Sequence, residues 1–317
     1  VRLVGSEMCI RDSLKPKAIV LLNLSRDQLD RVGEINSIER ALRTAVNAHP
    51  EATIIANCDD VLITSVAWDH PNVVWVAAGA GWLGDSVTNP RSGGHIVRTD
   101  DDWYAVDSEA GADAADAAEF RRPTPDYVIE DDGLHLPSGE VIPLNLKLPG
   151  RANRGNAAQA IAAAVEAFDV PVAAAVRAAE DIDNVAGRYS TVHLGEHDVH
   201  LLLAKNPAGW QEALSMLDRD AAGVVIAVNA QQGDGEDVSW LWDVKFEDFG
   251  DTAVVAAGER ATDLAVRLLY ADIDHKLVHD PVDAIRACPP GRVEVLANYT
   301  AFRDLKKDLT KQEDYRG

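Results

Sequence analysis

A loop that combines acidic side chains with tryptophans is the most informative chemical feature of this sequence. Residues 233–243 hold two glycines, four acids and two tryptophans. They follow an apolar run, residues 224–228, that has the composition of a buried strand. In α/β sheets, ligands and catalytic groups collect at the carboxyl ends of strands. We expect either a catalytic or docking loop here, or a solvated acidic loop whose tryptophans pack into the core.

Polar side chains also follow the first predicted strand, residues 18–22. Asn23, Asp27 and Asp30 place oxygen atoms where the carboxyl end of that strand would present them. These atoms could face a metal ion or a substrate, and a capped turn explains the residues equally well. The residue types leave both interpretations open.

Lys205 and the pair Asp59 and Asp60 lie at the ends of two other predicted strands. Lys205 stands between a strand and a helix that starts at Pro207, where a cation would suit a transferring phosphoryl group. An ordinary surface lysine is the simpler alternative. Capping of the following helix explains the two aspartates better than metal binding does.

Three closely spaced histidines, His193, His197 and His200, suggest a metal cluster at first sight. Gly195 interrupts their strand-like segment, so the three side chains need not converge. A surface hairpin is the preferred interpretation.

The elements that must position these residues alternate between strands and helices, which predicts parallel sheets and an α/β fold. Two units are expected from the length of 317 residues, with a boundary at residue 189. Within the first unit, residues 95–143 change to short polar strands and an Ala/Asp-rich tip, which predicts an antiparallel insertion packed on Trp103, Tyr104, Phe120 and Tyr127. The expected strands are 18–22, 53–56, 72–76, 199–203, 224–228, 252–257 and 292–297. The expected helices are 38–48, 156–168, 172–179, 207–217, 261–270, 281–287 and 302–311.

The charge balance excludes some classes of partner. The chain carries 52 acidic and 30 basic residues, a formal net charge of −22. This balance argues against nonspecific binding to nucleic acid or to an anionic membrane surface. No apolar run approaches the ~20 residues of a membrane span. Three distant cysteines favour a reducing, cytoplasmic compartment over a disulfide framework.

Six short motifs resemble, in their order and spacing, the Mur ligase superfamily, and most closely its MurT-type synthetase subunits. They cover residues 14–311. Residues 22–35 resemble the signature that follows a central-domain strand, although Mur ligases usually have histidine where Gln28 stands. The others are Asn57-Cys58-Asp59-Asp60, residues 148–157, Ala186-Gly187-Arg188, residues 203–209, and the Asp-Gly-x-Asp-x-Ser-Trp loop at 234–240.

The resemblance implies a Mur ligase-like central domain at residues 14–189 and a Rossmann-like C-terminal domain at 190–317. It implies an ATP- and Mg²⁺-dependent synthetase that activates the α-carboxyl of D-glutamate in the lipid II stem peptide. A glutaminase partner of the GatD type would supply ammonia, and the product would carry D-isoglutamine. The expected location is the cytoplasm, at the inner face of the membrane.

The same resemblance implies roles for single residues. Asn156 would contact adenine, although an N-cap is the simpler explanation. Arg188 at the domain junction and Lys205 would bind the nucleotide. Asp237 would orient the histidine of the partner's Cys-His-Asp arrangement, with Asp234 and Asp243 as alternatives. Trp240 and Trp242, two residues apart, would share one face of an extended segment as interface anchors or as core.

Two features of MurT-type proteins are missing. No Gly-x-x-Gly-Lys-Thr phosphate loop occurs, and residues 1–13 look foreign to the protein. The predicted central domain is therefore incomplete, and we expect this chain to be inactive alone. No cysteine occurs in residues 95–127, where a zinc ribbon would lie, so no zinc is expected.

Two alternatives stay open. One is a ligase that adds an amino acid, as other Mur and folylpolyglutamate synthetases do. The other is a non-catalytic module that binds a partner, which the missing phosphate loop favours. Gln28 and the loop at 234–240 favour the amidotransferase instead.

Overall fold

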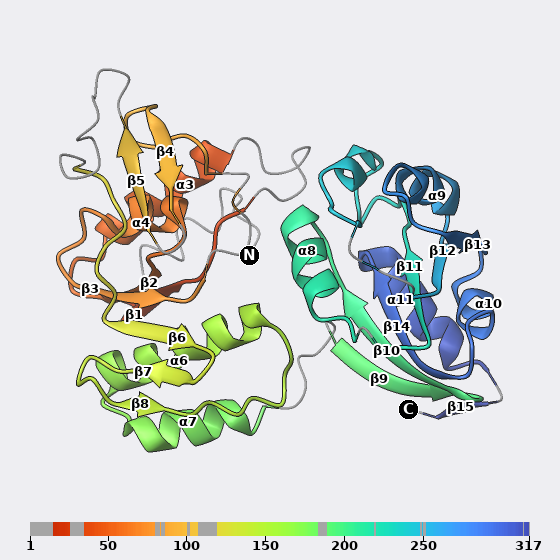
Figure 1. The fold of residues 1–317 in the computed structure, drawn as a ribbon. Coiled ribbons are helices and arrows are strands. Elements are labelled where there is room, and N and C mark those ends of the chain that lie inside the picture. The colour runs from red at the N-terminus through yellow and green to blue at the C-terminus, as the bar shows by residue number, and fades with distance from the viewer. Residues whose placement is uncertain are drawn as a thin grey trace. The chain divides into compact units, whose positions relative to one another are not determined.

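The computed structural model describes residues 15–25, 35–79, 83, 86–99, 102–106, 119–182, 189–218, 220–247, 249, 252–312 and 314–316 (Figure 1). They form two compact units; the first ends at Ile182 and the described part of the second begins at Tyr189. The predicted leader, residues 1–13, lies outside the described residues. Asp27, Asp30 and Arg188 lie outside them as well.

Unit 1 is built on a six-stranded mixed sheet in the order β1-β2-β3-β6-β7-β8. Its strands are β1 (Ala18–Leu21), β2 (Thr53–Asn57), β3 (Val73–Ala77), β6 (Tyr127–Glu130), β7 (Gly133–His135) and β8 (Val141–Ile142). The first four run parallel, and β7 and β8 continue the sheet antiparallel.

Helices cover both faces of this sheet. They are α3 (Ile35–Asn47), α4 (Val61–Ala67), α6 (Arg151–Phe168) and α7 (Val172–Glu180). Ile55 of β2 packs with Ile161 of α6, whereas its neighbour Ile54 packs with Val46 of α3 and Ile63 of α4. Side chains alternate between the two faces of a strand, so the apolar centre of β2 supplies both cores.

The predicted insertion is smaller than expected. A separate two-stranded sheet contains β4 (His95–Arg98) and β5 (Trp103–Val106), with Trp103 and Phe120 packed against Val61. β6 instead joins the main sheet beside β3, and Tyr127 lies in the main core. The expectation that Tyr127 holds the insertion is wrong, because a parallel pairing between strands 50 residues apart leaves no local sequence signal.

Helix α6 starts five residues earlier than predicted, and Asn156 is therefore not its N-cap. Gly150 occupies the cap with φ of 96°. Gly155 weakens the sequence pattern of a helix. In the structure it is required, since a Cβ at Gly155 would lie 2.4 Å from the carbonyl oxygen of Ala78.

Unit 2 contains a seven-stranded sheet in the order β13-β12-β11-β14-β10-β9-β15. Its strands are β9 (Tyr189–Leu194), β10 (His197–Leu203), β11 (Gly223–Ala227), β12 (Val254–Ala257), β13 (His275–Leu277), β14 (Gly291–Ala297) and β15 (Tyr315–Arg316). The strands from β13 to β10 are parallel, and β9 and β15 close one side antiparallel.

The helices of unit 2 also lie on both faces of its sheet. They are α8 (Pro207–Ser215), α9 (Ala261–Tyr270), α10 (Pro281–Arg286) and α11 (Tyr299–Leu309). One core joins β11 and β12 to α8 and α9, and the other joins the same strands to α10 and α11. No helix in the described part of the chain combines the length and apolar character that crossing a membrane requires.

Candidate functional site

The acidic loop of unit 2 leaves the sheet from a fixed point. β11 is buried along its whole length. At its end, the backbone N–H of Asn229 donates to Asn298 Oδ1 (3.0 Å), and Asn298 Nδ2 donates back to the carbonyl of Asn229 (2.7 Å). This reciprocal pair joins the ends of β11 and β14, so the loop starts from a rigid base at the carboxyl edge.

Asp234 has a structural role within that loop. Its carboxylate is 8% exposed and accepts hydrogen bonds from the backbone N–H of Thr300 (2.9 Å) and from the Thr300 hydroxyl. It thus caps the first turn of α11 from a distant part of the chain. The contact also explains why α11 begins at Tyr299, three residues before the predicted start.

Asp237 has the opposite environment. Its side chain is exposed, with Oδ1 accepting from the backbone N–H of Ser239 (2.7 Å) and Oδ2 from the Ser239 hydroxyl (3.0 Å). The backbone hydrogen bond, and then the hydroxyl, lower the pKa of Asp237. A carboxylate has about four lone-pair sites, so this ionised group is oriented and can still accept a hydrogen bond from an imidazole N–H.

The two tryptophans of the loop do not share a face. Residues Ser239–Trp242 form a 3₁₀ turn instead of an extended segment. Trp240 stacks on the buried Trp210, with ring centroids 5.5 Å apart. Trp242 is 56% exposed and meets the edge of Tyr270 at 5.3 Å. The common-face prediction is wrong: Trp240 is partly buried and packs against the core, whereas Trp242 is exposed.

Lys205 lies where the sequence placed it, between β10 and α8. Asn206 caps α8 by accepting from the N–H of Gly209 (2.8 Å). The Lys205 ammonium is exposed and lies 5.0 Å from the ring centroid of Tyr299. A Cβ at Gly233 would lie 3.2 Å from the same ring. Tyr299, which sequence reasoning missed, therefore contacts both the lysine and the acidic loop.

At the carboxyl edge of unit 1, Asn57 joins three strand ends. Its Nδ2 donates to Asn23 Oδ1 and to the carbonyl of Gly79, each at 2.9 Å, while its Oδ1 accepts from the N–H of Asp59 (3.0 Å). Asn57 is fully buried. Asn23 thus contacts Asn57, the first residue of the Asn57-Cys58-Asp59-Asp60 motif.

The two neighbouring aspartates, Asp59 and Asp60, have different partners. Asp59 pairs with Arg122 Nε at 2.7 Å and accepts from the N–H of Gly79. Asp60 caps α4 through Ile63 N–H (2.9 Å). The capping prediction is confirmed for Asp60 and wrong for Asp59, because the Arg122 contact depends on a residue 63 positions away.

Burial raises the pKa of two groups at this edge. It raises the pKa of Asp60 to about 6, although backbone N–H groups oppose the rise. It raises the pKa of the Cys58 thiol to about 12. Cys58 therefore stays a neutral thiol at pH 7 and is no nucleophile.

Asn156 lies in the second turn of α6 and is half-buried. Among the described residues its side chain makes no hydrogen bond. Gly150 stands at the N-cap of α6 and has no side chain to cap the helix. A half-buried amide with no partner among the described residues can hydrogen-bond a ligand.

The three histidines do not form a cluster. His193 pairs with Asp198, His200 with the Tyr189 hydroxyl, and His197 contacts the carbonyl oxygens of Leu194 and Cys288. They do lie on a hairpin, β9–β10, as predicted. His197 is 9% exposed, however, so that part of the hairpin is core and not surface.

Comparison with known proteins shows what the chain resembles. Residues 203–302 match the family model described as MurT ligase C-terminal. The chain is 26% identical, over 98% of its length and 73% of the relative's, to the lipid II isoglutaminyl synthase (glutamine-hydrolyzing) subunit MurT of Streptococcus pneumoniae (strain ATCC BAA-255 / R6).

Two solved structures share the fold. A pseudomurein peptide ligase type C from Methanothermus fervidus has a TM-score of 0.69 at 14% identity, covering 94% of this chain and 64% of that one. A bifunctional folylpolyglutamate synthase/dihydrofolate synthase from Yersinia pestis, complexed with AMPPNP and an Mn ion, has a TM-score of 0.52 at 14% identity, covering 94% and 63%. The chain thus spans under two thirds of each of these ligases.

The fold and its two carboxyl edges define an α/β protein of the Mur ligase type, as the sequence predicted. The order of its motifs and the match over unit 2 then narrow the class. The chain is similar to a MurT subunit over 98% of its length, and residues 203–302 match the MurT C-terminal family model.

Proposed function

We propose that this chain is the synthetase subunit of an ATP-dependent amidotransferase. It would activate the α-carboxyl of D-glutamate in the lipid II stem peptide, and ammonia from a GatD-type glutaminase would convert that group to D-isoglutamine. The similarity to a MurT subunit over 98% of this chain supports the assignment.

The environment of Asp237 is the observation that carries this proposal. A buried carboxylate would serve the fold, as Asp234 does. Asp237 is instead exposed, ionised and held by Ser239, in the same loop as the exposed Trp242. Such a group can fix the tautomer of a histidine supplied by another chain and stabilise the imidazolium during glutamine hydrolysis.

Unit 1 fits a nucleotide in part. The half-buried amide of Asn156, which makes no hydrogen bond among the described residues, can bind the polar groups of one. For Mg²⁺, Asn23 Oδ1 offers an oxygen, and phosphate oxygens supply most ligands of this ion in ATP sites. Asp59 and Asp60 are engaged by Arg122 and by backbone N–H groups. We assign them to the scaffold.

In the proposed reaction these side chains form no covalent bond to the substrate. ATP supplies the phosphoryl group that turns a carboxylate oxygen into a good leaving group. The protein must place the carboxylate, surround the phosphates with cations and exclude water. Lys205, exposed beside Tyr299, is our candidate cation in unit 2. Arg188 keeps its proposed nucleotide role, and Asp27 and Asp30 their proposed substrate or Mg²⁺ roles, as predictions.

The decisive experiment uses the chain together with its glutaminase partner. Asp237→Asn should lower glutamine hydrolysis by roughly two to four orders of magnitude while the two subunits still assemble. Glu236→Gln, the adjacent exposed acid, is the matched control and should leave hydrolysis unchanged. Normal glutamate release by the Asp237→Asn pair would remove this residue from the mechanism.

A substrate test separates the amidotransferase from an amino-acid-adding ligase. Ammonium should support product formation with the assembled pair, whereas free amino acids should not. Incorporation of an amino acid in place of ammonia would support the alternative ligase.

A further inference from the structure

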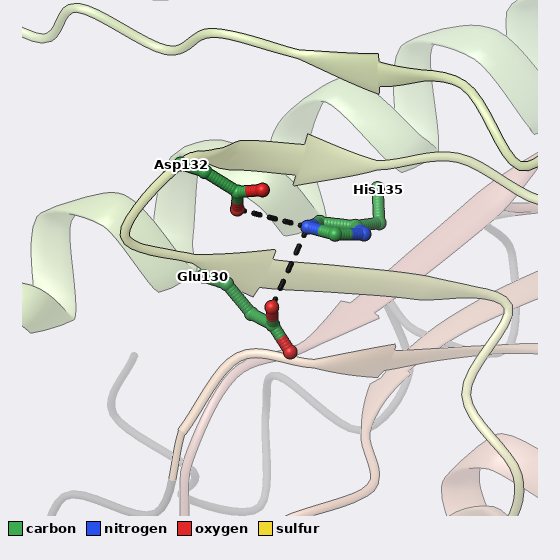
Figure 2. A group of neighbouring side chains, drawn as sticks. All are labelled: Glu130, Asp132 and His135. Atoms are coloured by element: carbon green, nitrogen blue, oxygen red, sulfur yellow. Dashed lines mark hydrogen bonds and ion pairs between the residues drawn. The ribbon is translucent and has the colours of Figure 1, made fainter.

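Three potential metal ligands meet on the β6–β7 hairpin of unit 1 (Figure 2). In the strand register Val128 lies opposite His135, and Glu130 lies two residues beyond Val128. Glu130 and His135 therefore project from the same face as diagonal neighbours. Asp132 reaches the same point from the turn between the strands.

The three ligand atoms lie close enough together for one ion to reach them all after small adjustments. His135 Nε2 lies 2.9 Å from Asp132 Oδ1 and 3.5 Å from Glu130 Oε2. All three atoms lie within 4.8 Å of one another. A tetrahedral ion with bonds of about 2.0–2.1 Å keeps its ligands about 3.3–3.4 Å apart. Small side-chain rotations would complete such a site.

The backbone that carries these ligands is fixed. Leu134 is fully buried between Gly133 and His135. Gly133 has φ of 150°, and a Cβ there would lie 2.3 Å from the carbonyl oxygen of Ile142 in β8. Arg154 of α6 donates to the carbonyl of Glu130 (2.6 Å). Ligand side chains thus face solvent from a braced hairpin, which is the arrangement that preorganises metal ligands.

The charge balance favours a further cation. Two carboxylates face one imidazole, and His135 is the sole cation paired with either of them among the described residues. The guanidinium of the nearby Arg154 donates instead to the backbone carbonyl oxygens of Glu130 and Leu144. Even a protonated histidine would leave one excess negative charge.

We propose that Glu130, Asp132 and His135 form a divalent transition-metal site, with Zn²⁺ as the ion to test. One imidazole nitrogen and two carboxylate oxygens suit this borderline ion, with water completing the shell. The site contains no thiolate and lies outside residues 95–127, so it is distinct from the zinc ribbon whose absence the sequence predicts. It also shares no residue with the proposed nucleotide or glutaminase-facing groups.

Calorimetric titration of the chelator-treated, dialysed full chain with Zn²⁺ tests the proposal. One saturable site is expected. His135→Ala and Asp132→Asn should each weaken it by about tenfold or more. Zn²⁺ should also raise the melting temperature of the original chain and not that of these variants.

His193→Ala is the matched control, because His193 and Asp198 form an exposed histidine–aspartate pair that has no third ligand in the described part of the chain. This variant should bind Zn²⁺ like the original chain. Absence of saturable binding would overturn the proposal. So would binding that survives both hairpin substitutions, or binding that His193→Ala removes equally. Asp132→Asn keeps the side-chain shape, so it answers the question even where His135→Ala folds poorly.

Discussion

The two carboxyl edges of this protein use similar residues in opposite ways. In unit 1, Asn57, Asp59 and Asp60 turn inward and bond to neighbouring strand ends, to Arg122 and to α4. In unit 2, Asp234 is buried and accepts a hydrogen bond from Thr300 of α11, whereas Asp237 and Trp242 are exposed. A carboxylate at a strand end is therefore scaffold or reactive group according to what folds over it.

Asn57→Ala should have the largest effect on stability. The fully buried amide joins three strand ends, and its loss leaves the carbonyl of Gly79 and the N–H of Asp59 without their partner. We expect unfolding free energy to fall by about 2–4 kcal/mol. Denaturant titration measures this change.

The control for that measurement is Asp237→Ala, at the carboxyl edge of unit 2. We call this edge open, because Asp237 and Trp242 are exposed there, and the carboxyl edge of unit 1 closed, because Asn57 and Asp60 are engaged by neighbouring residues. Its expected change is below about 0.5 kcal/mol, as for other exposed sites. Equal losses in the two variants would show that the contrast between a closed and an open edge is wrong.

Trp240→Ala and Trp242→Ala compare two neighbours within the open edge. Trp240 stacks on the buried Trp210, so its truncation should cost about 2–3 kcal/mol of unfolding free energy. Trp242 is 56% exposed, so its truncation should cost less than about 1 kcal/mol. Thermal melts of both variants check the order.

Affinity for the glutaminase should fall more in Trp242→Ala than in Trp240→Ala, the reverse of the order expected for stability. Trp242→Ala is expected to weaken binding by about tenfold, as loss of an exposed aromatic anchor does. Unchanged affinity would mean that Trp242 lies outside the interface.

The raised pKa of Asp60 predicts a pH dependence at the closed edge. Burial raises this pKa from 3.8 to about 6, so the folded state binds the proton more tightly than the unfolded state. This contribution to stability is present below about pH 4 and is lost as pH rises through 6, by about 3 kcal/mol. Asp60→Asn keeps a capping oxygen and removes the titration.

Comparison of unfolding free energy at pH 4 and pH 7 tests this sign. The original chain should lose stability relative to Asp60→Asn as pH rises. A constant difference between the two proteins across that range would show that Asp60 titrates normally.

Ser239→Ala should have the smallest effect. It removes the hydroxyl that holds Asp237 Oδ2, while the backbone bond to Oδ1 stays. Glutamine hydrolysis by the assembled pair should fall by about threefold to tenfold, with affinity for the partner unchanged. A fall as deep as that of Asp237→Asn would instead make Ser239 part of the reacting group.

Local pattern was sufficient for most elements. The buried strand at β11 and the helix at α9 follow from apolar runs and periodicity, since these signals lie within ten residues. Lys205 was placed correctly between a strand and a helix for the same reason. Helix starts were less predictable: α6 contains Gly155, and α11 is capped by Asp234 from 66 residues away.

The sequence by itself determined the α/β class, the similarity to MurT proteins, and the residue types that gather at strand ends, because composition, alternation and motif order are properties of the chain. Tertiary structure alone decided which acid is buried. Asp234 and Asp237 are three residues apart in one loop, yet Thr300 engages the first and solvent surrounds the second. That distinction depends on contacts between distant segments, and no local pattern encodes them.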